Sequence, residues 1–506
     1  FPDKSEVGFS LGSHEHVGGG FQVSDEDYYF TASFSGDAGH EYSLLDPDSL
    51  ERVDSKDPKQ DYHIYLGKNL GLTQFSFHHH RRNENGYYGF DRVDNYASRS
   101  SRSYTSFHVD HMFISDRYFE LTGRVLANNR FAQFAGRLSA PNTFTLISNP
   151  SSDDPLLATT EADSNQYGFR LLGDQLLLNG NLSVGAEYIY SDPVDAVAIA
   201  NFDIIDISQF PISTTEIRYY GNDPVFTPFV EPNSNQTFSL FSELQYRLSD
   251  KLNSITSLRY DYASNIDEGE ILPRIALVYG LSETQYLKFI HSQAFRNPGA
   301  IELHATNNNT LLGNEDLTSE IVRSNEVIWT YQSDRLFTNF SIFETQIDNS
   351  IEQAIIDGRR VFINLDQETN RGAEFEFRIN PIDSFQLNLT YHYLEKMLDS
   401  AFRLSDNTGS FSAQWGQNKW VVGINGYYHS ESQMYANANL DLITLPSYWN
   451  YALKASYDVS SKYSISLHIG NLLDETYYTP TISAILPEGL PSRGREIIFS
   501  INSKIE

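Results

Sequence analysis

Residues 374–393 read EFEFRINPIDSFQLNLTYHY, two alternating runs on either side of a short turn. In both runs an aromatic or aliphatic side chain recurs at every second position, and charged, amide or hydroxyl side chains stand between. Successive side chains of a β-strand point to opposite faces, so each run predicts a strand with one apolar and one polar face. The segment Asn380–Ser384 joins them and predicts a tight turn.

The same alternation recurs along the chain and is clearest near its end. Apolar and polar side chains alternate through Trp449–Val459, Tyr463–Ile469 and Ile497–Ile505. A soluble sandwich would enclose the apolar face and leave the polar face in water. Ionisable residues on strand after strand favour a barrel with lipid outside and a wet lumen inside, so the pattern predicts an all-β, transmembrane antiparallel β-barrel.

The composition agrees with one large membrane unit. The 506 residues contain no linker or compositional break, so we expect a single barrel domain over 1–506. The sequence contains no run of about 18 apolar residues, so it does not predict a membrane-spanning helix. The mean hydropathy of -0.41 suits strands that give lipid every second side chain. Aromatic residues make up 14% of the chain and suit two interfacial girdles, and zero Cys excludes disulfides and thiolate sites.

The charge balance excludes one class of partner. A formal net charge of -30 would repel a phosphate backbone, so nucleic acid is not expected. Solvated acidic loops explain this charge better than an acidic binding site. The chain opens with Phe1–Lys4, which already includes charged residues and does not resemble a signal peptide. We expect it to begin after processing or part-way through a longer precursor.

Counting the alternating segments gives about 22 strands, the size of barrels whose lumen is plugged. Tight turns are expected at 25–27, 69–71, 115–116, 173–175, 249–251, 282–284, 333–334, 380–384, 416–418 and 460–462. Longer connections are expected at 38–61, 81–105, 129–165, 191–235, 264–270, 296–320, 350–360, 396–407, 429–447 and 475–494. This rhythm is typical of short periplasmic turns and long extracellular loops. Within 191–235 the apolar stretch Ala196–Phe210 fits a short helix or a folded lid.

Several motifs resemble one family in their order and spacing. They are FRNP at 295–298, IEL at 301–303, GNEDL at 313–317 with SE at 319–320, NRGAE at 370–374, GNLLDETY at 470–477 and PSRGR at 491–495. Together they resemble the signature of TonB-dependent outer-membrane receptors, over essentially the whole chain. The resemblance implies a transporter and not an enzyme, located in the outer membrane of a Gram-negative cell.

The resemblance also implies a function and partners. We expect energy-coupled uptake of a scarce solute such as a ferric siderophore, haem, cobalamin or another metal complex. Its partners would be outer-membrane lipid and lipopolysaccharide, a plug domain outside this chain, a TonB-type energy-coupling protein and a surface lipoprotein. The alternative is a plugless barrel that acts as a surface receptor, a passive channel or an anchor for partner proteins.

The chain departs from the family pattern at both ends. Members carry an N-terminal plug domain preceded by a TonB-contacting box, whereas Glu6–Leu11 already resembles the first barrel strand. We expect the plug to belong to the precursor, because an open lumen of this size would have no selectivity. The chain ends at Lys504–Glu506, where outer-membrane barrels usually end on an aromatic residue, so a few C-terminal residues are expected to follow.

Two glutamates are candidates for contact with a plug. The alternation places Glu326 and Glu374 on the lumen side of their strands. Carboxylates in a lumen need partners or pay for desolvation. In the family that the chain resembles, two barrel glutamates at matching places bind two plug arginines, which implies the same role here. The structural alternative is that both merely line a wet lumen with Arg378.

Histidines and arginines near the loops are candidates for ligand binding. The run His78–Arg82 reads HHHRR, and alternation places His78 and His80 on one side. Imidazole pairs suit haem iron, copper or zinc, and Arg81 and Arg82 suit an anionic ligand such as a ferric siderophore. His304 follows the family motif, where haem receptors often have a loop histidine. The structural alternative, a polar loop base, has the greater weight, and the sequence does not identify a metal.

Catalytic motifs are missing from the sequence. It contains no nucleophile elbow, Walker loop, dinucleotide fingerprint or zinc-protease helix. We therefore expect no enzyme activity and no intrinsic cofactor, and a metal chelate or haem only as the transported ligand.

Overall fold

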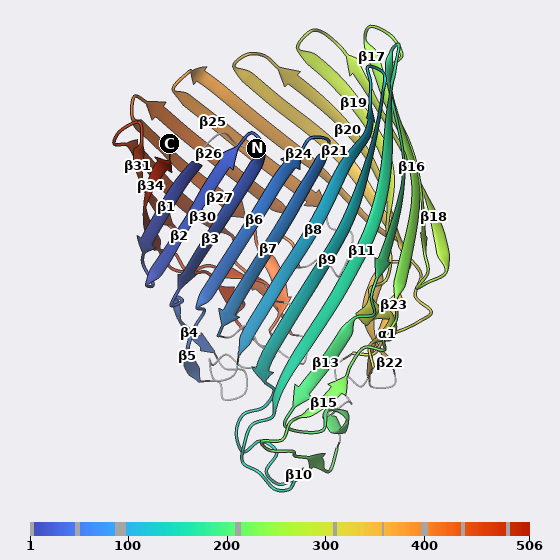
Figure 1. Cartoon of the computed structure of the whole chain (residues 1–506). Coiled ribbons are helices and arrows are strands. Elements are labelled where there is room, and N and C mark those ends of the chain that lie inside the picture. The colour runs from blue at the N-terminus through green and yellow to red at the C-terminus, as the bar shows by residue number, and fades with distance from the viewer. Residues whose placement is uncertain are drawn as a thin grey trace.

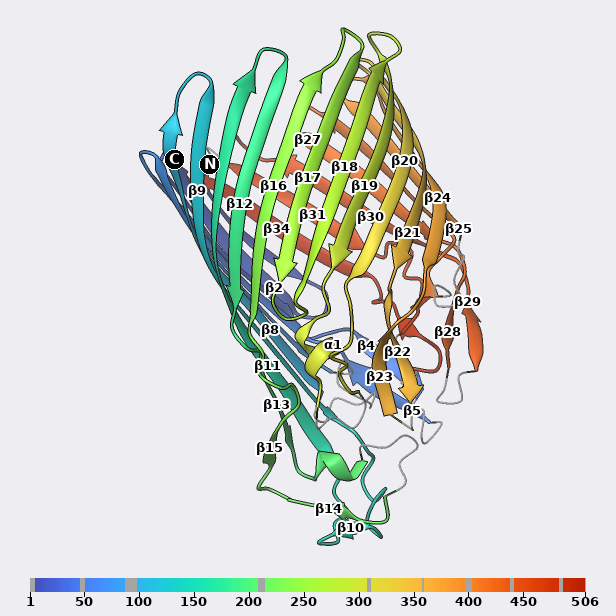
Figure 2. The same cartoon turned by 90° about the vertical axis from the view of Figure 1, so that its right-hand side faces the viewer.

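A computed structural model describes residues 5–45, 51–86, 98–207, 214–306, 311–356, 359–395, 403–436, 441–481 and 486–505. The chain forms a closed antiparallel barrel of 22 strands (Figures 1 and 2). Each strand pairs with the next barrel strand along the chain, and β1 (Ser5–Gly12) closes the ring by pairing with β34 (Glu496–Ile505). The predicted fold and strand count are confirmed.

The strands between β1 and β34 cover most of the chain. The first half of the wall consists of β2 (His16–Asp25), β3 (Tyr28–Asp37), β6 (Lys59–Leu70), β7 (Thr73–Asn85), β8 (Arg99–Ser115), β9 (Phe119–Arg137), β11 (Leu157–Leu177), β12 (Gly180–Ser191), β16 (Asn235–Arg247) and β17 (Leu252–Ala263). The second half consists of β18 (Glu268–Gly280), β19 (Gln285–Arg296), β20 (Glu320–Gln332), β21 (Leu336–Asp348), β24 (Glu368–Ile382), β25 (Phe385–Glu395), β26 (Asn407–Gln417), β27 (Trp420–His429), β30 (Tyr448–Asp458) and β31 (Tyr463–Gly470).

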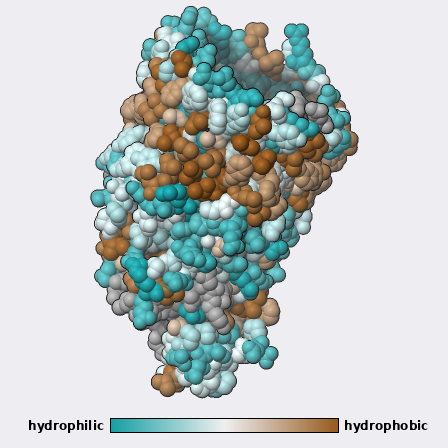
Figure 3. Space-filling model, turned by 90° about the vertical axis from the view of Figure 1, so that its left-hand side faces the viewer, coloured by the Kyte–Doolittle hydropathy of each residue, from teal (hydrophilic) through white to brown (hydrophobic). Residues whose placement is uncertain are grey.

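The cross-strand register confirms the predicted faces. Phe375 pairs with Tyr391 and Phe340, and all three side chains are exposed on the outer face. Glu374 pairs with His392 and Ser341 on the inner face. Figure 3 shows the apolar outer residues as a band across the face in view, with mostly hydrophilic surface on either side of the band. The membrane-facing surface therefore comes from every second residue of each strand.

The connections follow the predicted rhythm with three corrections. β11 continues through the turn expected at 173–175 and turns at 178–179 instead, because its register with β12 extends to Leu177 and Gly180. The connection expected to be long at 264–270 is the tight turn 264–267 between β17 and β18. The turn at 13–15 between β1 and β2 is also short, at the rim that bears the long loops. Long and short connections therefore do not alternate strictly.

The long connections fold into small units at one rim. Their elements are β4 (Glu41–Leu45), β5 (Arg52–Lys56), β10 (Ser148–Asn149), β13 (Asp195–Ala200), η1 (Ile204–Ile207), β14 (Ile217–Arg218), β15 (Val225–Pro228), α1 (Ala300–His304), β22 (Ile351–Ile356), β23 (Arg359–Asn364), β28 (Ser432–Tyr435), β29 (Leu442–Leu445), β32 (Tyr478–Thr479) and β33 (Leu490–Pro491). Of these, β13 and β15 extend the main sheet to 24 strands. The strand β13 pairs with Ala158–Asp163 near the start of β11, and β15 pairs with β13. The stretch expected to be a helix or lid is thus β13 followed by the 3-10 turn η1, and residues 208–210 of it lie outside the described residues.

Three buried apolar clusters hold these loop units together. The largest joins the described parts of 138–156 and 192–234, which we call the outer lobe, around Phe202, Ile217 and Val230. Further clusters form around Tyr42 and Leu486, and around Leu303, Leu317, Ile351 and Phe362. No helix in the part of the chain that the structure describes is long and apolar enough to cross a membrane. The dry cores lie in the loops because the barrel interior is lined by polar residues.

Candidate functional site

The two candidate plug contacts lie on the inner wall, one strand apart. Glu326 on β20 pairs with Phe343 of β21, and Glu374 on β24 pairs with Ser341 of the same strand. Because Ser341 and Phe343 are successive inner positions of β21, the two carboxylates lie at neighbouring heights on one patch of wall. The structure therefore brings Glu326 and Glu374 together, as a shared contact surface requires.

The surroundings of Glu374 continue as a polar row. His392 Nδ1 lies 3.3 Å from Glu374 Oε1, and both side chains are about half exposed to the lumen. The register continues this row through Thr408 of β26 and His429 of β27. Glu374 thus has an imidazole beside it on the wall, and its side chain is otherwise open to the lumen.

The histidine run divides between the two faces as predicted. His78 and His80 point inward, where His78 lies 4.9 Å from His63, measured between ring centroids. His80 Nε2 lies 3.4 Å from Asp61 Oδ1. His79 belongs to the outer face, where it hydrogen-bonds the hydroxyl of Thr105 at 2.9 Å. Among the described residues no group of three or more His, Cys, Asp or Glu side chains is placed to hold a metal ion.

The two arginines of the same run face opposite sides. Arg82 pairs in register with Asp61 and points inward, where its guanidinium contacts Glu84 at 2.6 Å. Arg81 is on the outer face and donates from Nε to Asn83 Oδ1 at 3.2 Å. Only Arg82 therefore shares the lumen side with His78 and His80, and the five residues do not form one site.

His304 is a buried residue of α1 rather than an open loop ligand. Its Nε2 lies 2.8 Å from Asn233 Nδ2 and its Nδ1 lies 3.2 Å from Glu315 Oε1, and only 9% of the residue is exposed. These contacts tie α1 to the end of the outer lobe. The geometry gives His304 a packing role, which the sequence motif alone did not distinguish from ligand binding.

The motif arginine before α1 is a structural node. Arg296 contacts Glu320 at 2.5 Å and Glu302 at 2.8 Å, and Glu302 also accepts the backbone N–H of Gly299 at 2.6 Å. Glu320 accepts the backbone N–H of Ile351 at 2.6 Å. Two carboxylates and one guanidinium thus join the loop 297–319 to the start of β22 in the next long loop, because charge-assisted hydrogen bonds are the strongest of their class.

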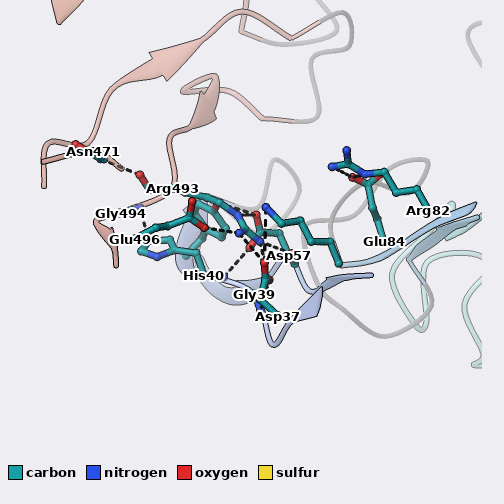
Figure 4. A network of polar contacts seen from close by, with 12 residues as sticks. Asp37, Gly39, His40, Asp57, Arg82, Glu84, Asn471, Arg493, Gly494 and Glu496 are labelled. Carbon is teal, nitrogen blue, oxygen red and sulfur yellow. Dashed lines mark hydrogen bonds and ion pairs between the residues drawn. The ribbon is translucent and has the colours of Figure 1, made fainter. Parts of the chain in front are cut away.

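A second motif arginine, Arg493, joins the last strand to the first long loop (Figure 4). Its Nη2 lies 3.0 Å from Asp37 Oδ1, and its Nε lies 2.7 Å from Asp57 Oδ2. We call this set of three residues the rim clasp. Burial would lower the pKa of Arg493, but the hydrogen bonds that Arg493 donates to Asp37 and Asp57 outweigh it and raise that pKa. The guanidinium therefore stays cationic at any physiological pH.

His40 lies against the rim clasp. Its backbone N–H donates to Asp57 Oδ1 at 2.6 Å, and its Nε2 accepts the backbone N–H of Gly494 at 3.4 Å. Its ring packs edge-on against His14 at 5.1 Å between centroids. Burial, with the charge of His14 and Arg493, lowers the pKa of His40, so the neutral ring is favoured in this loop.

An aromatic stack at the loop end of the lumen is a feature that sequence reasoning missed. The rings of Tyr448 and Tyr477 stack at 4.0 Å with an interplanar angle of 10°, and His429 stacks on Tyr448 at 5.0 Å. Tyr448 belongs to the inner face, since its partner in register is His429. The alternation of Trp449 and Tyr451 outward already placed Tyr448 inward, but Tyr477 lies in a loop whose path the pattern did not predict.

The inner wall formed by β11, β12, β16 and β17 is heavily charged. Arg259 of β17 contacts Asp261 at 2.6 Å and Glu187 of β12 at 3.7 Å. Arg170 and Arg259 both lie over the ring of Phe241, at 5.1 and 5.4 Å from its centroid. Aromatic faces and carboxylates stabilise the arginines that point into the lumen.

The closed ring, its apolar outer band and its polar lumen define an outer-membrane β-barrel. The family model described as "TonB dependent receptor-like, beta-barrel" matches residues 9–472, and this chain belongs to that family. Members are transporters and not enzymes, and they reside in the outer membrane of Gram-negative bacteria. The rim with the long loops is therefore the extracellular rim, and the rim with the tight turns is the periplasmic one.

Solved structures of similar fold come from the same group of receptors. A mutant of the ferric enterobactin receptor PfeA from Pseudomonas aeruginosa superimposes with a TM-score of 0.71 at 13% identity, over 99% of this chain and 80% of that chain. The copper transporter OprC gives a TM-score of 0.73 at 15% identity over the same shares. The siderophore receptor PirA from Acinetobacter baumannii gives 0.71 at 12% identity, also over 99% and 80%. At these identities the likeness concerns the fold.

Proposed function

We propose that this chain is the barrel of an energy-coupled importer that takes up a metal chelate, such as a ferric siderophore, haem, cobalamin or a similar complex. Membership of the TonB-dependent receptor family supports it, as do the siderophore and copper transporters among the proteins of similar fold. The barrel has the strand number at which lumens are plugged. A loop-based receptor surface and a gated lumen are the two parts that such a function needs.

The observation that carries the proposal is the folded loop layer at the extracellular rim. Three apolar cores hold units of this layer together, so the layer presents a shaped surface to the medium. Behind it the stacked rings of His429, Tyr448 and Tyr477 face the lumen. Flat aromatic faces suit the planar rings of a metal chelate, and this arrangement favours capture before passage.

The proposal includes a plug domain and a TonB-type coupling protein as partners. Glu326 and Glu374 form a carboxylate patch on the wall of β20 and β24. Basic side chains of a plug would compensate these charges in the lumen. Outer-membrane lipid and lipopolysaccharide would contact the apolar outer band, and a surface lipoprotein would contact the loop layer.

The register offers a sharp test of the loop layer. Ser191 pairs with Asn235, and Arg296 pairs with Glu320, so each hairpin can be closed directly at the barrel rim. We replace 192–234 or 297–319 by an Asn-Gly turn in the full-length receptor and compare both with a variant in which Asn-Gly replaces the periplasmic turn 248–251. Assembly is measured by the heat-dependent migration of the folded barrel, and uptake with a panel of radiolabelled ferric catecholate, ferric hydroxamate, haem and cobalamin.

We expect all three variants to assemble, and only the two extracellular variants to lose uptake. Uptake that persists in both extracellular variants would contradict the receptor function. Large ionic conductance of the purified full-length receptor in a planar bilayer would support the passive-channel alternative instead, because a plugged barrel is nearly silent.

A further inference from the structure

A hollow of about 520 Å³ lies on the inner wall where the ends of the chain meet. It extends over β34, β1, β2, β3 and β6, and the inward side chains around it include Ser10, His16, Ser33, Asp61 and Ser500. This part of the wall lies across the barrel from β17 and β19 in the strand order. The hollow is therefore a separate feature from the candidate plug contacts on β20 and β24.

Glycines create this hollow. Gly8, Gly18 and Gly20 all face inward on β1 and β2, where Gly8 pairs with Gly20 and Gly18 with Ser10. A Cβ atom on Gly18 would lie 2.6 Å from Ser10 Oγ, and one on Gly20 would lie 2.9 Å from Ser33 Cβ. Side chains at these positions would fill the space, so the wall is thin here because its residues lack them.

A second hollow of about 230 Å³ continues the first toward the extracellular rim. The two share His16, Ser35, Asp61 and Ile498 among their lining residues. The first hollow begins at Glu6, next to the periplasmic end of β1, and the second one reaches Asp37 and Glu496 near the extracellular rim. Together they form a groove along nearly the whole height of the wall, which we call the inner groove.

The chemistry of the inner groove differs from that of the opposite wall. Its middle is lined by hydroxyls and glycine backbone. The part nearer the extracellular rim is lined by the carboxylate of Asp61 and the imidazoles of His16 and His80. Across the lumen, Arg259 of β17 is engaged by Asp261 at 2.6 Å and by Glu187 of β12 at 3.7 Å. The carboxylates of Glu6 and Asp61 attract cations and hydrogen-bond donors, whereas a wall of fixed ion pairs suits a docked protein surface.

We propose that the inner groove is the path of the solute through the receptor and that it takes hydrophilic solutes with cationic or hydrogen-bond-donating groups. This inference rests on the proposed importer function. A plug bound to Glu326 and Glu374 is held to the wall of β20 and β24, on the far side from β1, β2 and β3. The side of the lumen with the least side-chain volume then stays open to water.

The chain has zero Cys, so single cysteines can be placed without background. Ser500 of β34 and Ser292 of β19 are matched positions, since both are partly buried serines on the inner face in the middle of their strands. We label Ser500→Cys and Ser292→Cys of the full-length receptor in intact cells with a small cationic methanethiosulfonate and with its anionic sulfonate analogue. Labelling of the denatured receptor gives the total reactive thiol.

The proposal expects Ser500→Cys to be labelled in intact cells and Ser292→Cys to be protected until denaturation. It also expects the cationic reagent to exceed the anionic one at Ser500→Cys by about tenfold at low salt, because Asp61 lies on the route. Equal labelling of the two positions, protection of Ser500→Cys, or faster reaction with the anion would overturn the groove. The loop-replacement test of the importer is independent, since a failed groove leaves its uptake result standing.

Discussion

Arg493 binds Asp37 across the turn of the β1–β2 hairpin, with Nη2 3.0 Å from Oδ1. The contact is possible because the turn at 13–15 is short, so the residues before β34 can reach the end of β3 above it. Ser13 takes part by accepting the backbone N–H of Ile497 at its hydroxyl, at 2.9 Å. The rim clasp thus bridges the place where the first and last strands meet.

Removing the central cation of the rim clasp should destabilise the extracellular end of the barrel. In Arg493→Gln, the carboxylates of Asp37 and Asp57, whose side chains are 3% and 2% exposed, lose their ion pair. Breaking a buried pair costs about 3–5 kcal/mol. We expect a lower temperature for the loss of folded migration in SDS. Arg371→Gln, which breaks an exposed ion pair with Glu344, is the control and should change it little.

Acid should loosen the first long loop through His40. Its folded pKa lies below the ordinary value of 6.5, so protonation favours the state in which the ring is released. The stability that the neutral ring gives is complete above pH 6.5 and is lost as the pH falls toward the lowered pKa. Protease cleavage in 38–58 should therefore accelerate over this interval in the intact receptor. A cleavage rate in His40→Gln that rises equally would show that another group is responsible.

The aromatic stack should contribute to ligand affinity. Replacing Tyr448 by Leu keeps an apolar side chain but removes the ring that Tyr477 and His429 face. A lost aromatic pair is worth about 0.5–1.5 kcal/mol, which corresponds to a loss of roughly three- to tenfold in affinity. Binding is measured with the ligand that the uptake panel identifies. Tyr463→Leu, at an exposed outer position of β31, should leave the affinity unchanged.

The carboxylate patch should hold the plug. In the full-length receptor, Glu326→Gln with Glu374→Gln should raise the conductance and ease extraction of the plug by urea, more than either change alone. The matched control is Glu376→Gln, the next inner position of β24, whose carboxylate already contacts Arg378 at 3.4 Å. If the double variant behaves like this control, the two glutamates only line the lumen.

Sequence patterns predicted the parts of this protein that depend on short-range periodicity. The faces of residues 374–379 and 385–393 follow from a period of two, and the same rule separated His78 and His80 from His79. The expected turn at 173–175 failed because Gly173 and Asp174 are turn-forming residues that the sheet pairing keeps extended. Local preference was overridden by the register with β12.

Contacts between distant segments could not be predicted in this way. Nothing near His304 in the chain indicates that Asn233 meets its ring, so a buried packing histidine resembled an exposed ligand. The partners of Arg493 lie at the other end of the sequence and depend on the closure of the ring. The motif arginines were noticed as family signals, but their role as rim fastenings follows only from three-dimensional proximity.

The pairing of Ser5 with Ile505 also has a kinetic consequence. The ring cannot close until the last strand has left the ribosome and reached the membrane, so the first strand waits with an unpaired edge throughout synthesis. A contact between strands so far apart in sequence is among the slowest to form. The topology therefore makes the pairing of the first barrel strand with the last one the final step of ring closure.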